Sequence, residues 1–388
     1  MTNRVYLIAG EVSGDYLGAQ LLSHLRELEP ELDIAGVGGT QMADQGLASL
    51  FPMEELSLMG FVEILPHLPR LIRRIYQTVD HIKAFDPDVV VTIDSPGFCL
   101  RVLKRLQGTR ARRMHYVAPQ AWAWRPGRAA KFKDLIDEML LLFPFEQAFF
   151  ETYGVNTRFV GHPITESWRE PRDPQALASE LGLNRADPIL CLLPGSRRSE
   201  VDKHLPVIAE TLAILRDEFP RLGCVLPTLP RLKDRVSDGT KSWPVPTAVF
   251  DDRNRRYDAY ALCGAAIAAS GTVGLELALA GLPPVIIYRG NPISAALARR
   301  LIRVPHVSLL NLILEREAFR ELLQENLTPG VLARETALLL ADGERSQRGR
   351  ADLRQVVAAL QGEGSDPPSL HAARRVLANI ELVPRPSA

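Results

Sequence analysis

The sequence predicts an α/β protein whose two nucleotide-type domains face each other across a cleft. The chain has 388 residues, which is too long for one ordinary hydrophobic core. Short apolar runs alternate with amphipathic stretches, which is the pattern of βαβ units and of a parallel sheet. Around residues 161–174 a polar segment with three prolines interrupts this pattern, which then starts again. These observations together predict two α/β domains joined by a linker.

The first domain is expected over residues 1–165. Its strands are predicted where four or five apolar residues follow one another. The expected strands are Val5–Ala9, Ile34–Val37, Val89–Ile93, Met114–Ala118 and Met139–Phe143. The helices expected between them are Gly18–Leu28, Leu65–Phe85, Leu100–Gln107, Arg128–Phe132 and Glu146–Tyr153.

The second domain is expected over residues 175–343 and repeats the alternation of strand and helix. Its expected strands are Ile189–Leu193, Cys224–Pro227, Ala248–Phe250, Ala265–Ala269 and Pro284–Tyr288. Its expected helices are Leu205–Glu218, Tyr257–Cys263 and Val273–Ala280. Residues 344–388 are Arg-rich and then helical in pattern, and we expect them to form a separate C-terminal helical tail.

Composition excludes several classes of protein. Hydrophobic residues make up 46% of the chain and charged residues 24%, as in globular proteins. The 46 basic and 46 acidic residues balance, so no global charge favours nucleic acid and any anion site must be local. The four cysteines are far apart in apolar runs and predict buried thiols. No apolar run approaches the roughly 18 residues of a membrane-spanning helix, and the N-terminus does not resemble a signal peptide.

The first candidate site follows the expected strand 265–269. Ser270, Gly271 and Thr272 end this strand, and a helix with an acid, Glu276, comes next. Free N–H groups at the start of a helix, with two hydroxyls beside them, suit a phosphate group. The carboxylate of Glu276 suits two adjacent ribose hydroxyls. The alternative is an ordinary helix cap with a first-turn acid that favours the helix dipole.

A second candidate loop, Pro194-Gly195-Ser196-Arg197, follows the expected strand 189–193. Arg197 stays charged and can pair with a diphosphate in bidentate fashion. The alternative is a solvated arginine in a turn. Neither this loop nor residues 270–272 has the Walker A or the GxGxxG pattern, which disfavours ATP hydrolysis and a dinucleotide-dependent dehydrogenase.

Two loops of the first domain also carry candidate site residues. Glu11, Ser13 and Asp15 follow the first strand and offer acceptors and a hydroxyl to a polar substrate. Asp94 closes a fully apolar strand, and a carboxylate in that position is a candidate general base. The alternatives are that Ser13 caps a helix whose first turn includes Asp15, and that Asp94 caps a turn.

The sequence predicts neither a metal ion nor a cofactor. Asp86-Pro87-Asp88 has the DxD spacing with which some transferases hold a divalent cation, but it precedes its strand and so lies away from the expected cleft. The eight histidines are scattered without the spacing of metal ligands.

These loops belong to longer stretches that resemble bacterial lipid-A-disaccharide synthases, which are glycosyltransferases of the two-domain, Rossmann-like GT-B fold. The stretches follow the order of that family over about the first 330 residues. They include AGEVSGD (9–15), IDSPGF (93–98), HYVAPQAWAWRPGR (115–128), LLPGSRRSEV (192–201), ASGTVGLELALAGLPPVIIYR (269–289) and VSLLNLI (307–313). The sequence departs from the usual pattern of this family at two positions. Gly97 stands where a second acid is frequent, and Arg198 stands where a glycine is common.

The resemblance implies one reaction of lipid A biosynthesis, on the route to lipopolysaccharide. The donor would be UDP-2,3-diacylglucosamine and the acceptor 2,3-diacylglucosamine 1-phosphate, called lipid X. An inverting transfer to the acceptor's 6-hydroxyl would give the β-1,6-linked disaccharide 1-phosphate and UDP. The alternative is another UDP-sugar enzyme of the GT-B fold, such as an N-acetylglucosaminyltransferase or an epimerase.

The resemblance also implies roles for the candidate residues. Asp94 would take the proton of the acceptor hydroxyl, while Arg197 and residues 270–272 would stabilise the departing diphosphate. Glu276 would hold the ribose. Members of the family resemble C-terminally swapped homodimers, in which an asparagine matching Asn311 completes the donor site of the partner.

The expected location is cytoplasmic, with peripheral association with the inner membrane. Residues 56–76 combine apolar side chains with interleaved arginines, which suits contact with anionic lipid. The alternative for this stretch is a buried amphipathic helix.

Overall fold

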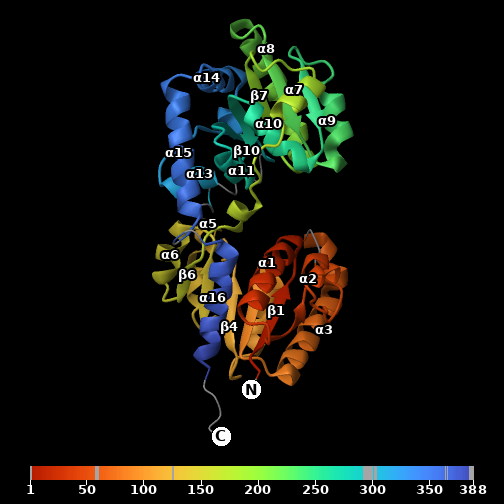
Figure 1. Cartoon of the computed structure of the whole chain (residues 1–388), viewed down its shortest axis with the longest axis vertical. Helices are drawn as coiled ribbons and strands as arrows, with labels where there is room; N and C mark the ends of the chain where they lie inside the picture. The colour runs from red at the N-terminus through yellow and green to blue at the C-terminus, as the bar shows by residue number, and fades with distance from the viewer. Residues whose placement is uncertain are drawn as a thin grey trace. The chain divides into compact units, whose positions relative to one another are not determined.

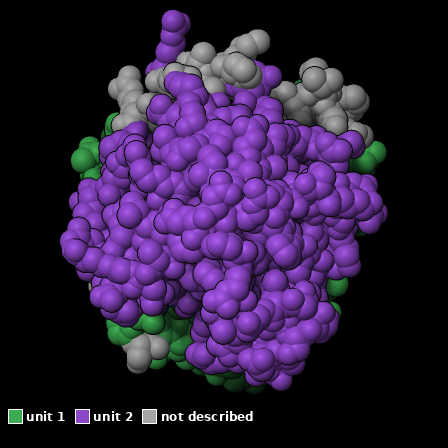
Figure 2. Space-filling view, turned by 90° about the horizontal axis from the view of Figure 1, so that it is seen from above, with its two compact units in different colours: residues 1–166, 360–388 green, residues 167–359 purple. Residues whose placement is uncertain are grey.

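The computed structural model describes residues 2–56, 61–124, 126–291, 300, 304–362, 364 and 366–383. The chain divides into two compact units (Figure 2). Unit 1 consists of Met1–Glu166 and Leu360–Ala388, and unit 2 of Ser167–Ala359.

Unit 1 contains a six-stranded parallel sheet in the order β2-β1-β3-β4-β5-β6 (Figure 1). Apolar strands buried on both faces of a parallel sheet read as continuous hydrophobic runs, which is why the sequence reveals them. The strands are β1 (Arg4–Ala9), β2 (Asp33–Val37), β3 (Val89–Ile93), β4 (Arg112–Tyr116), β5 (Glu138–Leu141) and β6 (Thr157–Phe159). The short β6 lies outside the expected set because its residues carry no apolar run.

Helices cover both faces of this sheet. Val5, Leu7 and Ala9 of β1 share one core with α1 (Val12–Leu28) and α16 (Pro368–Glu381). Tyr6 and Ile8 point the opposite way, into a second core with α3 and α4. This division follows from the alternation of side chains along a strand. The remaining described helices of the unit are α2 (Thr40–Asp44), α3 (Phe61–Phe85), α4 (Pro96–Arg105), α5 (Ala121–Trp124) and α6 (Pro144–Glu151).

Unit 2 contains a second six-stranded parallel sheet, in the order β12-β11-β10-β7-β8-β9. Its strands are β7 (Ile189–Leu193), β8 (Gly223–Pro227), β9 (Thr247–Phe250), β10 (Ala265–Ala269), β11 (Pro284–Tyr288) and β12 (Glu321–Leu323). Its described helices are α7 (Pro174–Glu180), α8 (Arg198–Glu218), α9 (Lys233–Thr240), α10 (Arg256–Leu262), α11 (Val273–Leu279), α13 (Leu309–Leu314), α14 (Pro329–Leu340) and α15 (Glu344–Leu360). The α/β fold with two sheets that the sequence predicts is confirmed.

The C-terminal segment is shared between the units. Helix α15 packs in unit 2 up to its last residue, whereas α16 lies against α1 in unit 1 (Figure 1). Arg375 and Asn379 of α16 donate hydrogen bonds of 2.9 and 2.6 Å to the buried carboxylate of Glu138 on β5. The end of the chain therefore returns to unit 1, whereas the sequence suggested a separate C-terminal tail.

None of the helices in the described part of the chain combines the length and the apolar character needed to traverse a bilayer. Within the stretch 56–76, residues 57–60 lie outside the described residues, and the rest of it begins α3. The thiols of Cys99, Cys191 and Cys224 are buried, as expected, and that of Cys263 is half-buried.

Candidate functional site

Each sheet has one place where the strand order reverses. In unit 1 this place lies between β1 and β3, and in unit 2 between β7 and β10. Crevices at the carboxyl ends of such strands are where open α/β sheets bind ligands. Nearly all the candidate residues named from the sequence lie in the loops that leave these four strands or in the first turn of the helix that follows.

In unit 1 the structure brings the loops after β1 and β3 into contact. Ser13 Oγ donates a hydrogen bond of 2.8 Å to Oδ2 of Asp94. Gly10 permits this approach, because a Cβ atom at that position would lie 2.6 Å from Ser95 Oγ. Two candidates that are far apart in the sequence thus form one polar site.

The backbone around Asp94 is strained. Asp94 and Ser95 have φ angles of +53° and +44°, and Val117, which follows β4, has a φ of +78°. A non-glycine residue in this region costs about 1–3 kcal/mol and persists only where the surroundings impose it, most often at functional sites. The Asp94 carboxylate also accepts the Ser95 N–H at 2.9 Å. Its orientation is therefore fixed from both sides.

Glu11 is the exposed acid beside this pair. Partial desolvation raises the pKa of its carboxyl, and the negative charge of Asp94 raises it further. Two carboxyl groups near one another are harder to ionise together than apart.

Asp15 has a different surrounding from the one expected. Its side chain is only 3% exposed, and its carboxylate accepts the N–H groups of Gly39, Gln41 and Met42 at 2.8–3.1 Å. These are the amides at the start of α2, so Asp15 caps that helix from α1. The described contacts give Asp15 a structural role, and its contact with substrate stays a prediction.

In unit 2 the loops after β7 and β10 border a cavity of about 510 Å³. Its lining includes Ser270, Gly271, Thr272 and Glu276, together with Ser196 and Arg197. Two lining residues, Arg256 and Tyr260 of α10, escaped the sequence analysis, because a helix that starts after an irregular loop gives no sign of where its side chains point.

The loop 270–272 presents backbone donors to this cavity. The Ser270 N–H is used by the carbonyl of Ile287. Within the described ranges, no acceptor meets the N–H groups of Gly271, Thr272 or Val273. Groups of this kind at the entry to a helix are the ones that bind anions.

Glu276 is held by two neighbours in the cavity. Its carboxylate forms an ion pair of 3.3 Å with Arg256 and accepts a hydrogen bond of 3.2 Å from the Tyr260 hydroxyl. Burial raises the pKa of Tyr260, and the negative charge of Glu276 adds to this effect. The hydroxyl therefore stays protonated and acts as a donor to Glu276.

Arg197 is held by Glu200 in the first turn of α8. Its guanidinium forms an ion pair of 3.2 Å with Glu200 while remaining 75% exposed. The same carboxylate accepts the N–H groups of Ser196 and Arg197 at 3.1 and 3.2 Å. The start of α8 is thus already neutralised by an internal acid, and a cation is left at the rim of the cavity.

Asn311 lies away from any open surface. It is fully buried, and its amide donates to Phe319 O and Glu321 at 2.8 Å while accepting the N–H groups of Ala318 and Phe319. Its hydrogen-bonding groups are all engaged within unit 2. The role in a partner's donor site that the resemblance implied therefore finds no support in these contacts.

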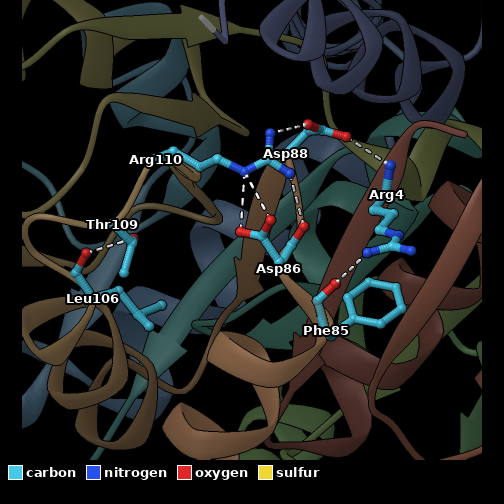
Figure 3. Close-up of polar contacts among 7 residues, drawn as sticks. All are labelled: Arg4, Phe85, Asp86, Asp88, Leu106, Thr109 and Arg110. Atoms are coloured by element: carbon cyan, nitrogen blue, oxygen red, sulfur yellow. Dashed lines mark hydrogen bonds and ion pairs between the residues drawn. The ribbon is translucent and has the colours of Figure 1, made fainter. Parts of the chain in front are cut away.

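Asp86 and Asp88 form an ion-pair cluster at the amino ends of β1 and β3 (Figure 3). Arg110 binds Asp86 at 3.0 Å and Asp88 at 3.1 Å, and the Arg4 N–H donates to Asp88 at 2.8 Å. The guanidinium of Arg110 therefore pairs with both carboxylates. Over the described ranges, the structure contains no group of three or more His, Cys, Asp or Glu side chains arranged to hold a metal.

Comparison with known proteins places this geometry in a family. The model of the lipid-A-disaccharide synthetase family matches residues 5–373. The chain is similar to the lipid-A-disaccharide synthase of Rhodospirillum centenum, with 48% identity over 96% of this chain and 94% of the relative. It is 41% identical to that of Gluconobacter oxydans over 95% of this chain and 89% of the relative.

A solved structure supports the fold independently. The chain superposes on the crystal structure of Acinetobacter baumannii MurG with a TM-score of 0.60 and 14% identity, over 97% of this chain and all of that one (100%). Likeness at this identity concerns the fold alone. The resemblance noted in the sequence is confirmed, and the chain belongs to the lipid-A-disaccharide synthase family of glycosyltransferases.

Proposed function

We propose that the chain transfers 2,3-diacylglucosamine from UDP-2,3-diacylglucosamine to the 6-hydroxyl of lipid X, with release of UDP. The observation that carries the proposal is the cavity of unit 2, in which unpaired loop amides and a tethered carboxylate lie together. Membership of the lipid-A-disaccharide synthase family supports the same substrates.

Unit 2 binds the donor in this proposal. The Glu276 carboxylate accepts hydrogen bonds from the two ribose hydroxyls, and Arg256 and Tyr260 hold it in place. The diphosphate takes the N–H groups of residues 271–273 and the hydroxyls of Ser270 and Thr272. Arg197 turns from Glu200 to the diphosphate, a short rearrangement for an exposed side chain.

Unit 1 binds the acceptor and supplies the base. Asp94 removes the proton of the 6-hydroxyl as that oxygen attacks the anomeric carbon from the face opposite UDP. The single displacement inverts the configuration. Donors preorganised around the leaving diphosphate stabilise the charge that grows on it. Ser13 and Glu11 bind the acceptor sugar beside Asp94, and Asp15 keeps the neighbouring helix in place.

We also propose that α3 contacts the cytoplasmic face of the inner membrane as a peripheral surface. Leu68, Ile72 and Tyr76 recur every four residues on one side of α3 and are 43%, 45% and 52% exposed. Arg70 and Arg73 are exposed beside them. An apolar stripe with a basic border suits a bilayer that contains anionic lipid. A homodimer is a separate proposal, which light scattering of the purified protein tests.

The test of the reaction is incubation with UDP-2,3-diacylglucosamine and lipid X. We expect UDP release and a product with the mass of the tetraacyl disaccharide 1-phosphate. Parallel incubation with UDP-N-acetylglucosamine tests the alternative enzymes of the same fold. Turnover of that sugar, with no disaccharide from the acylated pair, would overturn the proposal.

A further inference from the structure

A buried histidine connects two loops of unit 2. His204, in the second turn of α8, is 0% exposed. Its Nδ1 lies 2.6 Å from the carbonyl oxygen of Pro194, and its Nε2 lies 2.8 Å from the backbone nitrogen of Arg289. Pro194 and Arg289 follow β7 and β11, so one imidazole ring links two loops at the carboxyl edge of the sheet.

The partners determine which ring nitrogen carries the proton. The carbonyl of Pro194 can only accept and the N–H of Arg289 can only donate. The neutral ring must therefore carry its proton on Nδ1 and leave Nε2 as an acceptor. Burial lowers the pKa of His204, which keeps the ring in this neutral form.

Other side chains also bind the backbone of the loop 194–197, which His204 contacts at Pro194. Glu200, one turn earlier on the same face of α8, accepts the N–H groups of Ser196 and Arg197. Arg231 donates a hydrogen bond of 2.9 Å to the carbonyl of Ser196. Gly195, with a φ of +125°, passes so close to Glu200 that a Cβ atom would lie 2.6 Å from its Oε2. Pro194, Ser196 and Arg197 each form at least one hydrogen bond through their backbone.

We propose that His204 is a positioning residue that holds the loop 194–197, and with it Arg197, in place for the donor diphosphate. The proposal rests on the proposed function, because Arg197 matters only if the cavity binds a diphosphate. His204 acts through the Pro194 carbonyl and touches no substrate. Loss of that bond releases the Pro194 end of the loop, while Glu200 and Arg231 still hold Ser196 and Arg197. Loss of the bond to Arg289 leaves every bond of the loop 194–197 in place.

Two amide variants separate the two bonds. The amide nitrogen of His204→Asn reaches the position of Nδ1 and retains the bond to Pro194. The amide oxygen of His204→Gln reaches the position of Nε2 and retains only the bond to Arg289. His204→Phe retains neither. Thr211→Val is the matched control, because Thr211 is buried in the same helix and its hydroxyl bonds only backbone carbonyls.

Two readouts are measured on the full chain. Calorimetry should show that the affinity for UDP falls about tenfold in His204→Gln and His204→Phe. In His204→Asn and Thr211→Val the affinity should stay within about threefold of wild type. The KM for the donor should rise in the same order while the KM for lipid X stays constant. Hydrogen exchange of residues 194–200 without ligand should quicken in the Gln and Phe variants.

The outcomes separate the proposed function, which is binding of UDP, from the positioning role of His204. A wild-type protein that binds no UDP overturns the proposed function, whatever the exchange data show. Unchanged exchange of the loop in His204→Phe overturns the positioning role, even if UDP binds. An equal loss of UDP affinity in Thr211→Val and His204→Phe also overturns it, because the effect would then be general destabilisation of α8.

Discussion

The hydroxyl of Ser13 donates a 2.8 Å hydrogen bond to the carboxylate of Asp94, across 81 residues of sequence. A donor at this distance fixes the direction in which the carboxylate presents its lone pairs. Asp94 is thereby held as an oriented acceptor at the point where the strand order of unit 1 reverses.

The role of Asp94 as a base leads to the first prediction. Asp94→Asn should lower kcat by about 100-fold or more, because the amide cannot take up a proton. The affinity for UDP, measured by calorimetry, should stay the same, since UDP is assigned to unit 2. A variant with near wild-type turnover would exclude Asp94 as the base.

The hydrogen bond from Ser13 to Asp94 leads to a second prediction, of a smaller loss of activity. Ser13→Ala leaves Asp94 able to take a proton but removes one contact that orients it. We expect a decrease in kcat of about tenfold, smaller than that of Asp94→Asn. Steady-state kinetics with saturating donor measures the difference. Equal losses in both variants would show that Ser13 does more than orient Asp94.

Two adjacent arginines test the diphosphate contact. Arg197→Ala should weaken UDP binding by about 1.5–3 kcal/mol, the range for a hydrogen bond to a charged group. Arg198→Ala is the control, because this side chain is equally exposed and pairs loosely with Asp202 at 3.8 Å. UDP affinity that is the same in both variants would remove Arg197 from the site.

Asp15 should prove important for stability. Asp15→Asn replaces an acceptor of three backbone N–H groups with an amide that presents its own N–H to them. We expect unfolding to become easier by about 3 kcal/mol. Asp44→Asn, an exposed change in α2, the helix that Asp15 caps, should have little effect on the melting temperature. An unchanged melting temperature in Asp15→Asn, with a raised KM for lipid X, would restore its role in acceptor binding.

Glu146 should make the stability of the fold depend on pH. Burial raises the pKa of its carboxyl to about 7, against hydrogen bonds from Phe143 N and the Trp122 indole, which lower it. The protonated form is the one that the fold favours. Its contribution is therefore present below the pKa of about 4.5 in the unfolded chain and is lost as the pH rises towards 7.

The difference amounts to at most about 3 kcal/mol. Between pH 5 and pH 8, the melting temperature of the wild-type protein should fall more than that of Glu146→Gln. Glu151→Gln, an exposed change in the same helix α6, should keep the pH profile of the wild type. A profile of Glu146→Gln that matches the wild type would contradict this assignment.

The stripe on α3 can be tested by sedimentation with vesicles that contain phosphatidylglycerol. The double variant Leu68→Ser, Ile72→Ser should bind such vesicles at least about tenfold more weakly, because two apolar side chains no longer enter the bilayer. Leu338→Ser, which changes a side chain of similar exposure (49%) in unit 2, should bind as wild type does. Equal binding by both variants would exclude this stripe.

The sequence by itself located the described strands, except the short β6 and β12, and the loops that carry most of the candidate residues. A strand buried on both faces needs a nearly continuous apolar run, as Val89–Ile93 shows with Thr92 as its single polar residue. The polar residue that ends such a strand must lie at the sheet's edge. Asp94 and the Ser270–Thr272 loop could therefore be located from the pattern alone, together with the family motifs around them.

Only the tertiary structure decided the strand order and the contacts between distant segments. Periodicity reports which face of an element is buried, but it carries no information on the neighbour that covers it. The return of α16 to unit 1, the capping of α2 by Asp15 and the tethering of Glu276 by Tyr260 depend on such neighbours. His204 looked like any histidine on a helix until packing supplied an acceptor on one side of its ring and a donor on the other.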